Sequence, residues 1–167
     1  FGHGTNPTIV ATPEIGYDFT GWSGTGVSNS SSASTTVSMT QSRSLTANFS
    51  LKSYALSLSA GSGGSVSGAG SFDHGTNPTI AATPDTGYDF TGWSGTGVSN
   101  SSSASTTVSM TEARSLTANF SLKSYTLSLT AGSGGTVSGA GNYNHGQHAT
   151  IQATAQSGFV FNSWLQS

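Results

Sequence analysis

The chain has 167 residues, a formal net charge of −2, and only 6% charged residues, against about 25% in an average soluble domain. Binding to nucleic acid or to anionic membranes needs clustered Lys and Arg, so this composition excludes both. The chain has no cysteine and no apolar run near the roughly 18 residues of a membrane span. A Ser-, Thr- and Gly-rich chain without thiols is typical of an exported bacterial protein that avoids disulfide chemistry.

The sequence repeats at an offset of 71 residues. Residues 1–52 and 72–123 differ at six positions, and a third copy diverges after His145. The differences are Gly2/Asp73, Val10/Ala81, Glu14/Asp85, Ile15/Thr86, Gln41/Glu112 and Ser42/Ala113. A fixed period of this kind indicates tandem modules that contact their neighbours. We therefore expect a complete repeat over 53–123, preceded by a partial repeat over 1–52 that lacks its first hairpin. A partial, divergent repeat that lacks its last strands follows over 124–167.

The complete repeat begins with a strand pattern. Over 54–60, large apolar residues alternate with small or polar ones, the period of two expected of a half-buried strand. GSGG at 61–64 predicts a turn, because glycine adopts the positive φ that tight turns need. We expect a second strand over 65–72 to return from this turn, in which Gly68 and Gly70 either weaken the strand or mark a bulge.

Four further strands follow in the same repeat. The third is predicted over 79–83, and a Pro-Asp-Thr-Gly turn leads from it into a fourth over 88–93. A polar loop precedes a fifth strand over 106–110, and the last strand, over 115–122, alternates cleanly. Helix formers are scarce, so no substantial helix is expected. The prediction is an all-β fold of tandem small β modules.

The connection between repeats is short. Only four residues separate Phe120 from Tyr125, too few to act as a flexible tether. We therefore expect neighbouring repeats to stand in a fixed relation and to form a stiff rod. Since the strands carry almost no Lys or Glu, we also expect their edges to be short, covered by the loop at 99–105, or paired with a neighbour.

One repeat, over 54–120, reads Y-x-L-x-L, GSGG-x-V, F-x-HG-T, ATP-x-x-GY-x-F-x-GW, TTVSMT and SLTANF in that order. This order resembles the divergent form of the bacterial internalin B-type repeat, found in tandem in large secreted and cell-surface proteins. The resemblance implies a compact β-grasp-like or β-sandwich-like module that serves as a spacer or adhesive element and has no catalytic residues. The stretch 158–167 departs from the pattern, because it reads NSWLQS where the family has GW followed by small residues.

Candidate catalytic and metal-binding residues are sparse. His3, His74 and His145 are equivalent, but each repeat offers this one His without a Cys or a close carboxylate, so we interpret them as turn residues. Asp85 and Asp89 bracket a turn, and two carboxylates do not supply the six or more oxygens that Ca²⁺ prefers. No acid/base pair or Ser-His-Asp set recurs. We expect no metal, no cofactor and no enzymatic activity.

The tryptophans Trp22, Trp93 and Trp164 are the candidate binding residues. Trp93 has the opposite strand parity to Phe90. If Gly92 forms a bulge, Trp93 returns to the core, which we favour because a single Trp in a small domain usually anchors packing. Without a bulge, the indole lies outside and offers a stacking platform for a sugar ring.

Two motifs suggest modification chemistry. Residues 29–31 and 48–50 match the Asn-x-Ser pattern of N-glycosylation, which we interpret as coincidence in a bacterial protein. Lys52 lies four residues after Asn48 in one strand, roughly 13 Å away at 3.3 Å per residue, too far for a Lys–Asn isopeptide bond.

Three functions from different classes follow. The first is a structural spacer in a secreted or cell-surface adhesin or matrix protein. The second is a glycan-binding module with exposed aromatic residues, and the third is a self-assembling extracellular filament subunit. The expected partners are neighbouring repeats of the same chain, with other copies of the chain or a surface glycan or receptor as further candidates.

Overall fold

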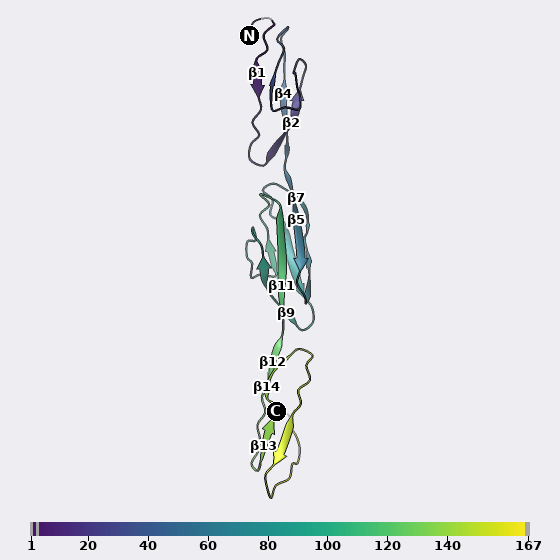
Figure 1. Ribbon diagram of the computed structural model, residues 1–167, viewed down its shortest axis with the longest axis vertical. Helices are drawn as coiled ribbons and strands as arrows, with labels where there is room; N and C mark the ends of the chain where they lie inside the picture. Colours follow the sequence, from purple (N-terminus) through teal and green to yellow (C-terminus); the bar gives the residue numbers. More distant parts are fainter. Residues whose placement is uncertain (1, 3, 166–167) are drawn as a thin grey trace.

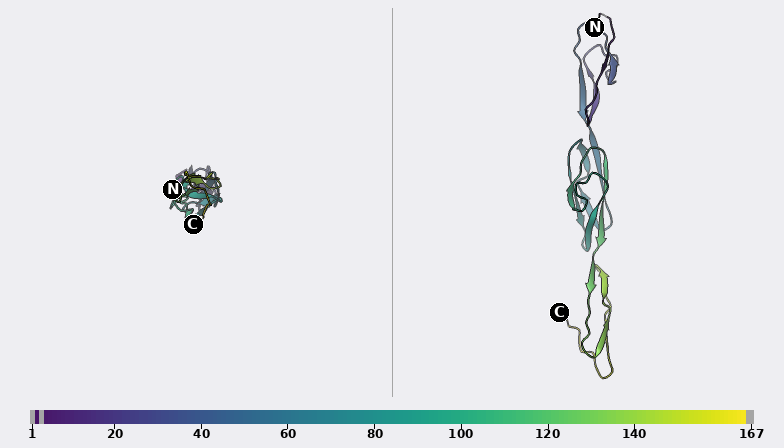
Figure 2. Two further views of the ribbon diagram at one scale, coloured as in Figure 1. Left: turned by 90° about the horizontal axis from the view of Figure 1, so that it is seen from below. Right: turned by 90° about the vertical axis from the view of Figure 1, so that its left-hand side faces the viewer.

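The computed structural model describes residues 2 and 4–165, and in them every helix or strand assigned is a β-strand. The strands form three repeats that follow one another along a narrow rod, seen from the side in Figure 1 and end-on in the left view of Figure 2. We call them the first repeat (β1–β4), the middle repeat (β5–β11) and the last repeat (β12–β15). The predicted all-β class and tandem arrangement are confirmed.

The bounds of the strands repeat with the sequence. The first repeat contains β1 (Thr8–Val10), β2 (Tyr17–Ser23), β3 (Ser34–Thr36) and β4 (Thr46–Leu51). The middle repeat contains β5 (Ser53–Ala60), β6 (Gly64–Ser67), β7 (Gly70–Asp73), β8 (Thr79–Pro84), β9 (Tyr88–Ser94), β10 (Ser105–Thr107) and β11 (Arg114–Leu122). The last repeat contains β12 (Ser124–Leu127), β13 (Gly135–Ser138), β14 (Gly141–Asn144) and β15 (Gln152–Ala155).

The middle repeat is a sandwich of two sheets. One sheet has the order β7-β5-β11-β9, with β11 parallel to β5 and antiparallel to β9, and the other has the order β10-β8-β6. Leu56 and Leu116 from the first sheet and Ile80 from the second belong to one core and are at most 2% exposed. The alternation predicted for these strands therefore supplies a single apolar layer between the sheets.

The predicted second strand, over 65–72, is wrong as a single element. The chain breaks at Gly68 into β6 and β7, which join different sheets: β6 pairs with β8, and β7 pairs with β5. Gly68 has φ of 104°, and a Cβ at this position would overlap the carbonyl oxygen of Thr79. Glycine here lets the backbone turn from one sheet to the other at close quarters.

A bulge in β9 places Trp93 in the core. Phe120 lies opposite Phe90 and Asn119 lies opposite Gly92, so Thr91 is the extra residue of the strand. Gly92 has φ of 146°, and the shift of register turns Trp93 inward to 5% exposure. The core position favoured from sequence is confirmed.

The edges of the middle repeat are short or covered. Strands β6 and β7 have four residues each and β10 has three. The longer outer strand, β9, is covered by the loop that follows it, since the backbone N–H of Trp93 donates to the carbonyl of Ser101 at 2.8 Å. The same loop reaches the second sheet, where Ala82 donates to the carbonyl of Ala104 at 2.9 Å. The loop therefore covers the edge as predicted.

Candidate functional site: the junction between repeats

A single residue, Lys52, separates the last strand of the first repeat from the first strand of the middle repeat. Its backbone N–H donates to the carbonyl of Gly16, in the first repeat, at 2.7 Å. Its carbonyl accepts from the backbone N–H of His74, in the middle repeat, at 2.8 Å. The linker residue is thus hydrogen-bonded on one side to each of the repeats that it joins.

The second junction has the same geometry. The N–H of Lys123 donates to the carbonyl of Gly87 at 2.8 Å, and the carbonyl of Lys123 accepts from His145 at 2.8 Å. Because the same two bonds form at both junctions, the arrangement follows from the repeated sequence. Figure 1 shows the chain passing directly from each repeat into the next at these two points.

A histidine of each downstream repeat packs on a glycine of the repeat before it. Gly16 and Gly87 are buried and have φ of 85° and 84°, in the left-handed region that favours glycine. A Cβ on Gly16 would overlap the imidazole of His74, and one on Gly87 would overlap that of His145. Close approach and backbone conformation therefore both require glycine at these positions.

These histidines lie in turns, as predicted, and each also contacts a tyrosine of its own repeat. The ring centroids of Tyr54 and His74 are 5.9 Å apart, and those of Tyr125 and His145 are 6.2 Å apart. The tyrosine is the second residue of the strand that leaves the linker, so the imidazole contacts both repeats. The third equivalent, His3, lies outside the described residues.

An ion pair lies on the outside of each junction. Lys52 Nζ is 3.5 Å from Asp18 Oδ1, and Lys123 Nζ is 3.4 Å from Asp89 Oδ1. The Asp18 and Asp89 side chains are 65% and 63% exposed, so each pair contributes only about 0–1 kcal/mol. The backbone hydrogen bonds and the histidine packing therefore hold the junctions.

Among the residues that the structure describes, no three His, Asp or Glu side chains gather where they could hold a metal ion. In that same part of the chain, no helix has the length and apolar character needed to cross a bilayer. What the structure shows at each junction is a linker residue that is hydrogen-bonded to both of its neighbouring repeats.

The three candidate tryptophans have different surroundings. Trp93 is buried, and its Nε1–H donates to the carbonyl of Ser103 at 3.0 Å, so it presents no ring face to a sugar. Trp22 is half-buried and makes the equivalent bond to Ser32 at 3.1 Å. Trp164 is 42% exposed. The most buried of the three rings is Trp93, in the repeat with the most strands.

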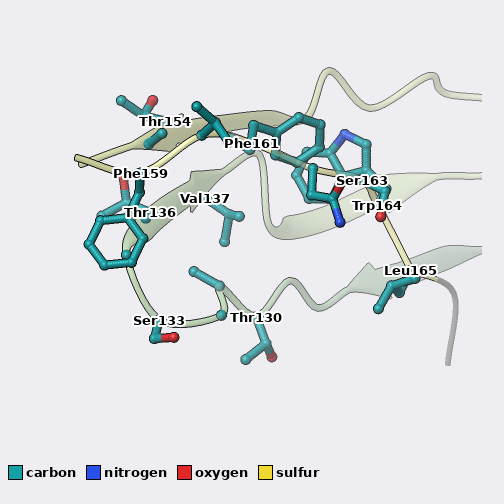
Figure 3. Close-up of a pocket in the computed structure, with 18 residues that line it drawn as sticks. Thr130, Ser133, Thr136, Val137, Thr154, Phe159, Phe161, Ser163, Trp164 and Leu165 are labelled. Carbon is teal, nitrogen blue, oxygen red and sulfur yellow. The ribbon is translucent and has the colours of Figure 1, made fainter. Parts of the chain in front are cut away.

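Trp164 lies beside a hollow of about 340 Å³ in the last repeat, drawn in Figure 3 with Phe159 and Phe161. In the middle repeat, the residues equivalent to those that line this hollow pack against β11. There, Gly61 donates to the carbonyl of Ala118 at 2.8 Å, and Gly64 lies against the ring of Phe120. The hollow thus occupies the place of a core strand, and we interpret its aromatic lining as core surface.

The residues that sequence reasoning missed are the glycine and histidine of the junction. HG occurs in all three repeats and GY in the first two, with Gly158-Phe159 at the equivalent position of the third, but the contact joins the GY of one repeat to the HG of the next. A pattern within one repeat does not reveal a contact between two. The only available signal was the constant offset of both motifs.

The fold and the junctions define the class of protein: tandem β modules that follow one another along a rod and are joined by single linker residues. The chain belongs to the divergent InlB B-repeat domain family, whose model matches residues 1–53, 54–124 and 125–167. The resemblance seen in the motifs is confirmed. Repeats of this family are typical of bacterial surface proteins and are not known as enzymes. No curated protein and no solved structure matches the chain.

Proposed function

We propose that these repeats form a non-catalytic stalk in a bacterial adhesin or matrix protein outside the cell. The stalk sets how far a terminal domain reaches and how stiffly it is held. The observation that carries this proposal is found at both junctions. The backbone groups of Lys52 and of Lys123 form hydrogen bonds with the repeat before and with the repeat after the linker. The typical occurrence of the family in surface proteins supports the location.

Stiffness and reach are linked by simple physics. A flexible chain of modules grows in end-to-end distance roughly as the square root of their number, whereas a stiff rod grows in proportion to it. The linker residue at each junction has both of its backbone groups bonded, so its φ and ψ are fixed by two repeats at once. Added repeats therefore add their full length to the reach of the array.

The experiment inserts one, two or three further copies of residues 53–123 after Lys123, which reproduces the native junction each time. Small-angle X-ray scattering then measures the maximum dimension of each chain. A constant increment per inserted repeat is the result that the proposal requires. Increments that shrink with repeat number would show flexible modules and remove the basis for a stalk.

A substitution tests the junction itself. Gly87→Ala places a Cβ against the imidazole of His145 and should bend or loosen the rod. Gly75→Ala is the matched control, because Gly75 has nearly the same φ, 83°, with nothing within 4 Å of a built Cβ. Both variants carry the backbone cost, of about 1–2 kcal/mol. Only Gly87→Ala should change the small-angle scattering profile away from that of the parent rod. Equal profiles for the two variants would argue against a role for the Gly87–His145 contact in holding the junction.

A further inference from the structure

The first repeat and the middle repeat each carry two Asn-x-Ser motifs, the acceptor pattern for N-glycosylation. In the middle repeat they are Asn100-Ser101-Ser102 and Asn119-Phe120-Ser121. The sequence pattern alone does not distinguish the two asparagines as glycosylation sites. Their surroundings in the structure are opposite.

The amide of Asn119 is used by the fold. This residue lies half-buried in β11, and its Nδ2 donates to the carbonyl of Gly92 at 3.1 Å and to Ser94 Oγ at 2.8 Å. These bonds hold the bulge that turns Trp93 into the core. A sugar on Asn119 Nδ2 would have to displace them.

The amide of Asn100 is presented to solvent. Asn100 is exposed in the loop after β9, and its Oδ1 accepts from the backbone N–H of Ser102 at 3.0 Å. This bond brings the asparagine and serine of the motif together in a turn. Within the described part of the chain, neither Asn100 Nδ2 nor Ser102 Oγ has a hydrogen-bond partner.

The loop is nevertheless held in place. The backbone N–H of Asn100 donates to Thr106 Oγ1 at 3.1 Å, and the carbonyls of Ser101 and Ser103 accept from the backbone and indole N–H of Trp93. The loop that carries the motif is therefore hydrogen-bonded on both sides of the asparagine, to Trp93 and to Thr106.

The first repeat reproduces the contrast. Asn29 is exposed, and its Oδ1 accepts from the N–H of Ser31 at 3.0 Å. Asn48 Nδ2 donates to the carbonyl of Gly21 at 3.1 Å and to Ser23 Oγ. The same partition of the two motifs thus occurs twice in the chain.

We propose that Asn100 and Asn29 are acceptor sites for an asparagine-linked glycan, and that Asn119 and Asn48 are not. The co-substrate is a sugar activated at its anomeric carbon by a phosphate leaving group. Asn100 Nδ2 forms a bond to that carbon, the bond from the carbon to the phosphate oxygen breaks, and the phosphate departs with the electron pair. The amide nitrogen gives up one proton to the transferase. A glycan here extends from the loop that covers the edge of β9, and so adds to its protection against pairing.

The experiment offers the folded 167-residue chain to two purified transferases. One arm uses a soluble asparagine glucosyltransferase with UDP-glucose, and the other uses a membrane oligosaccharyltransferase with a lipid-pyrophosphate-linked oligosaccharide. Peptide mass spectrometry measures occupancy at all four asparagines. We expect Asn100 and Asn29 to be occupied at least tenfold more than Asn119 and Asn48 in one arm or both, and the arm identifies the source of the sugar.

Two variants separate acceptor chemistry from loop structure. Ser102→Ala removes the motif hydroxyl but leaves the backbone N–H that bonds Asn100 Oδ1, so occupancy at Asn100 should fall at least tenfold while Tm is unchanged. Asn100→Gln should abolish it, with Asn29 as the internal control in the same molecule. No occupancy at Asn100 in either arm, or similar occupancy at Asn100 and Asn119 in the folded chain, would overturn the proposal.

Discussion

The first and middle repeats share nearly the same sequence over 1–52 and 72–123, yet their cores differ. Met110 and Leu116 are at most 1% exposed in the middle repeat, whereas their counterparts Met39 and Leu45 are only half-buried. The described first repeat has no counterpart of β5, β6 and β7. These three strands, rather than the composition of the shared stretch, therefore close the core.

The missing partners also shorten strands. Residues 114–116 belong to β11 and pair with β5, but their counterparts 43–45 fall outside β4. Likewise, β8 extends to Pro84 where it pairs with β6, while β1 ends at Val10. Identical or nearly identical residues thus become strand or non-strand according to whether a neighbouring strand can bond to them. Pairing, more than local propensity, sets these boundaries.

The largest expected effect comes from the tryptophans. Trp93→Ala should destabilise the middle repeat by about 3–5 kcal/mol, the usual cost of removing a buried aromatic side chain. Trp22→Ala should cost the first repeat clearly less, because Trp22 is half-buried. Amide hydrogen exchange, read separately for each repeat, measures both in one chain. Equal losses of stability would mean that β5–β7 do not add to the burial of the tryptophan.

A leucine pair tests the closing strand directly. Leu56→Ala in β5 should cost about 2–5 kcal/mol, since Leu56 is 2% exposed and belongs to the core between the two sheets. The matched variant Leu127→Ala in β12 changes a half-buried side chain and should cost less. Urea unfolding followed by exchange assigns each loss to its repeat. A larger cost at Leu127 would contradict the role given to β5.

A smaller effect is expected at the bulge. Asn119→Ala removes the amide that bonds Gly92 and Ser94, which should cost about 1 kcal/mol, the usual net value of a hydrogen bond. Asn48→Ala removes the same bonds at a more exposed position and should cost less. Thermal unfolding of the two variants ranks them, and the reverse order would indicate that burial does not govern the bulge.

The smallest effect concerns the junction ion pairs. Lys52→Ala and Lys123→Ala should each change the free energy of unfolding by less than about 1 kcal/mol, because both pairs are exposed. Their backbone hydrogen bonds do not depend on the side chain. Denaturant titration at low and high salt measures the change. A loss of several kcal/mol would place the strength of the junction in the ion pair.

Sequence periodicity predicted the strands whose apolar residues alternate without interruption, such as 54–60 and 115–122, because a strand in a two-sheet core needs that pattern. It did not predict the break at Gly68, which depends on the carbonyl of Thr79 in another sheet. Nor did it predict that His74 packs on Gly16, a contact between repeats. Local sequence patterns predict a strand and the turn next to it, but they do not predict contacts between residues that are distant in the chain.

The central claim is that both junctions hold their repeats in one fixed relation, and spin-label distances test it most directly. The chain has no native cysteine, so paired cysteines can be introduced at the exposed positions Ser50 and Asn77 across the first junction. The equivalent pair across the second is Ser121 and His148. Double electron–electron resonance should give two narrow distance distributions with the same mean. Broad distributions, or two different means, would contradict the account of a rod built from repeated rigid junctions.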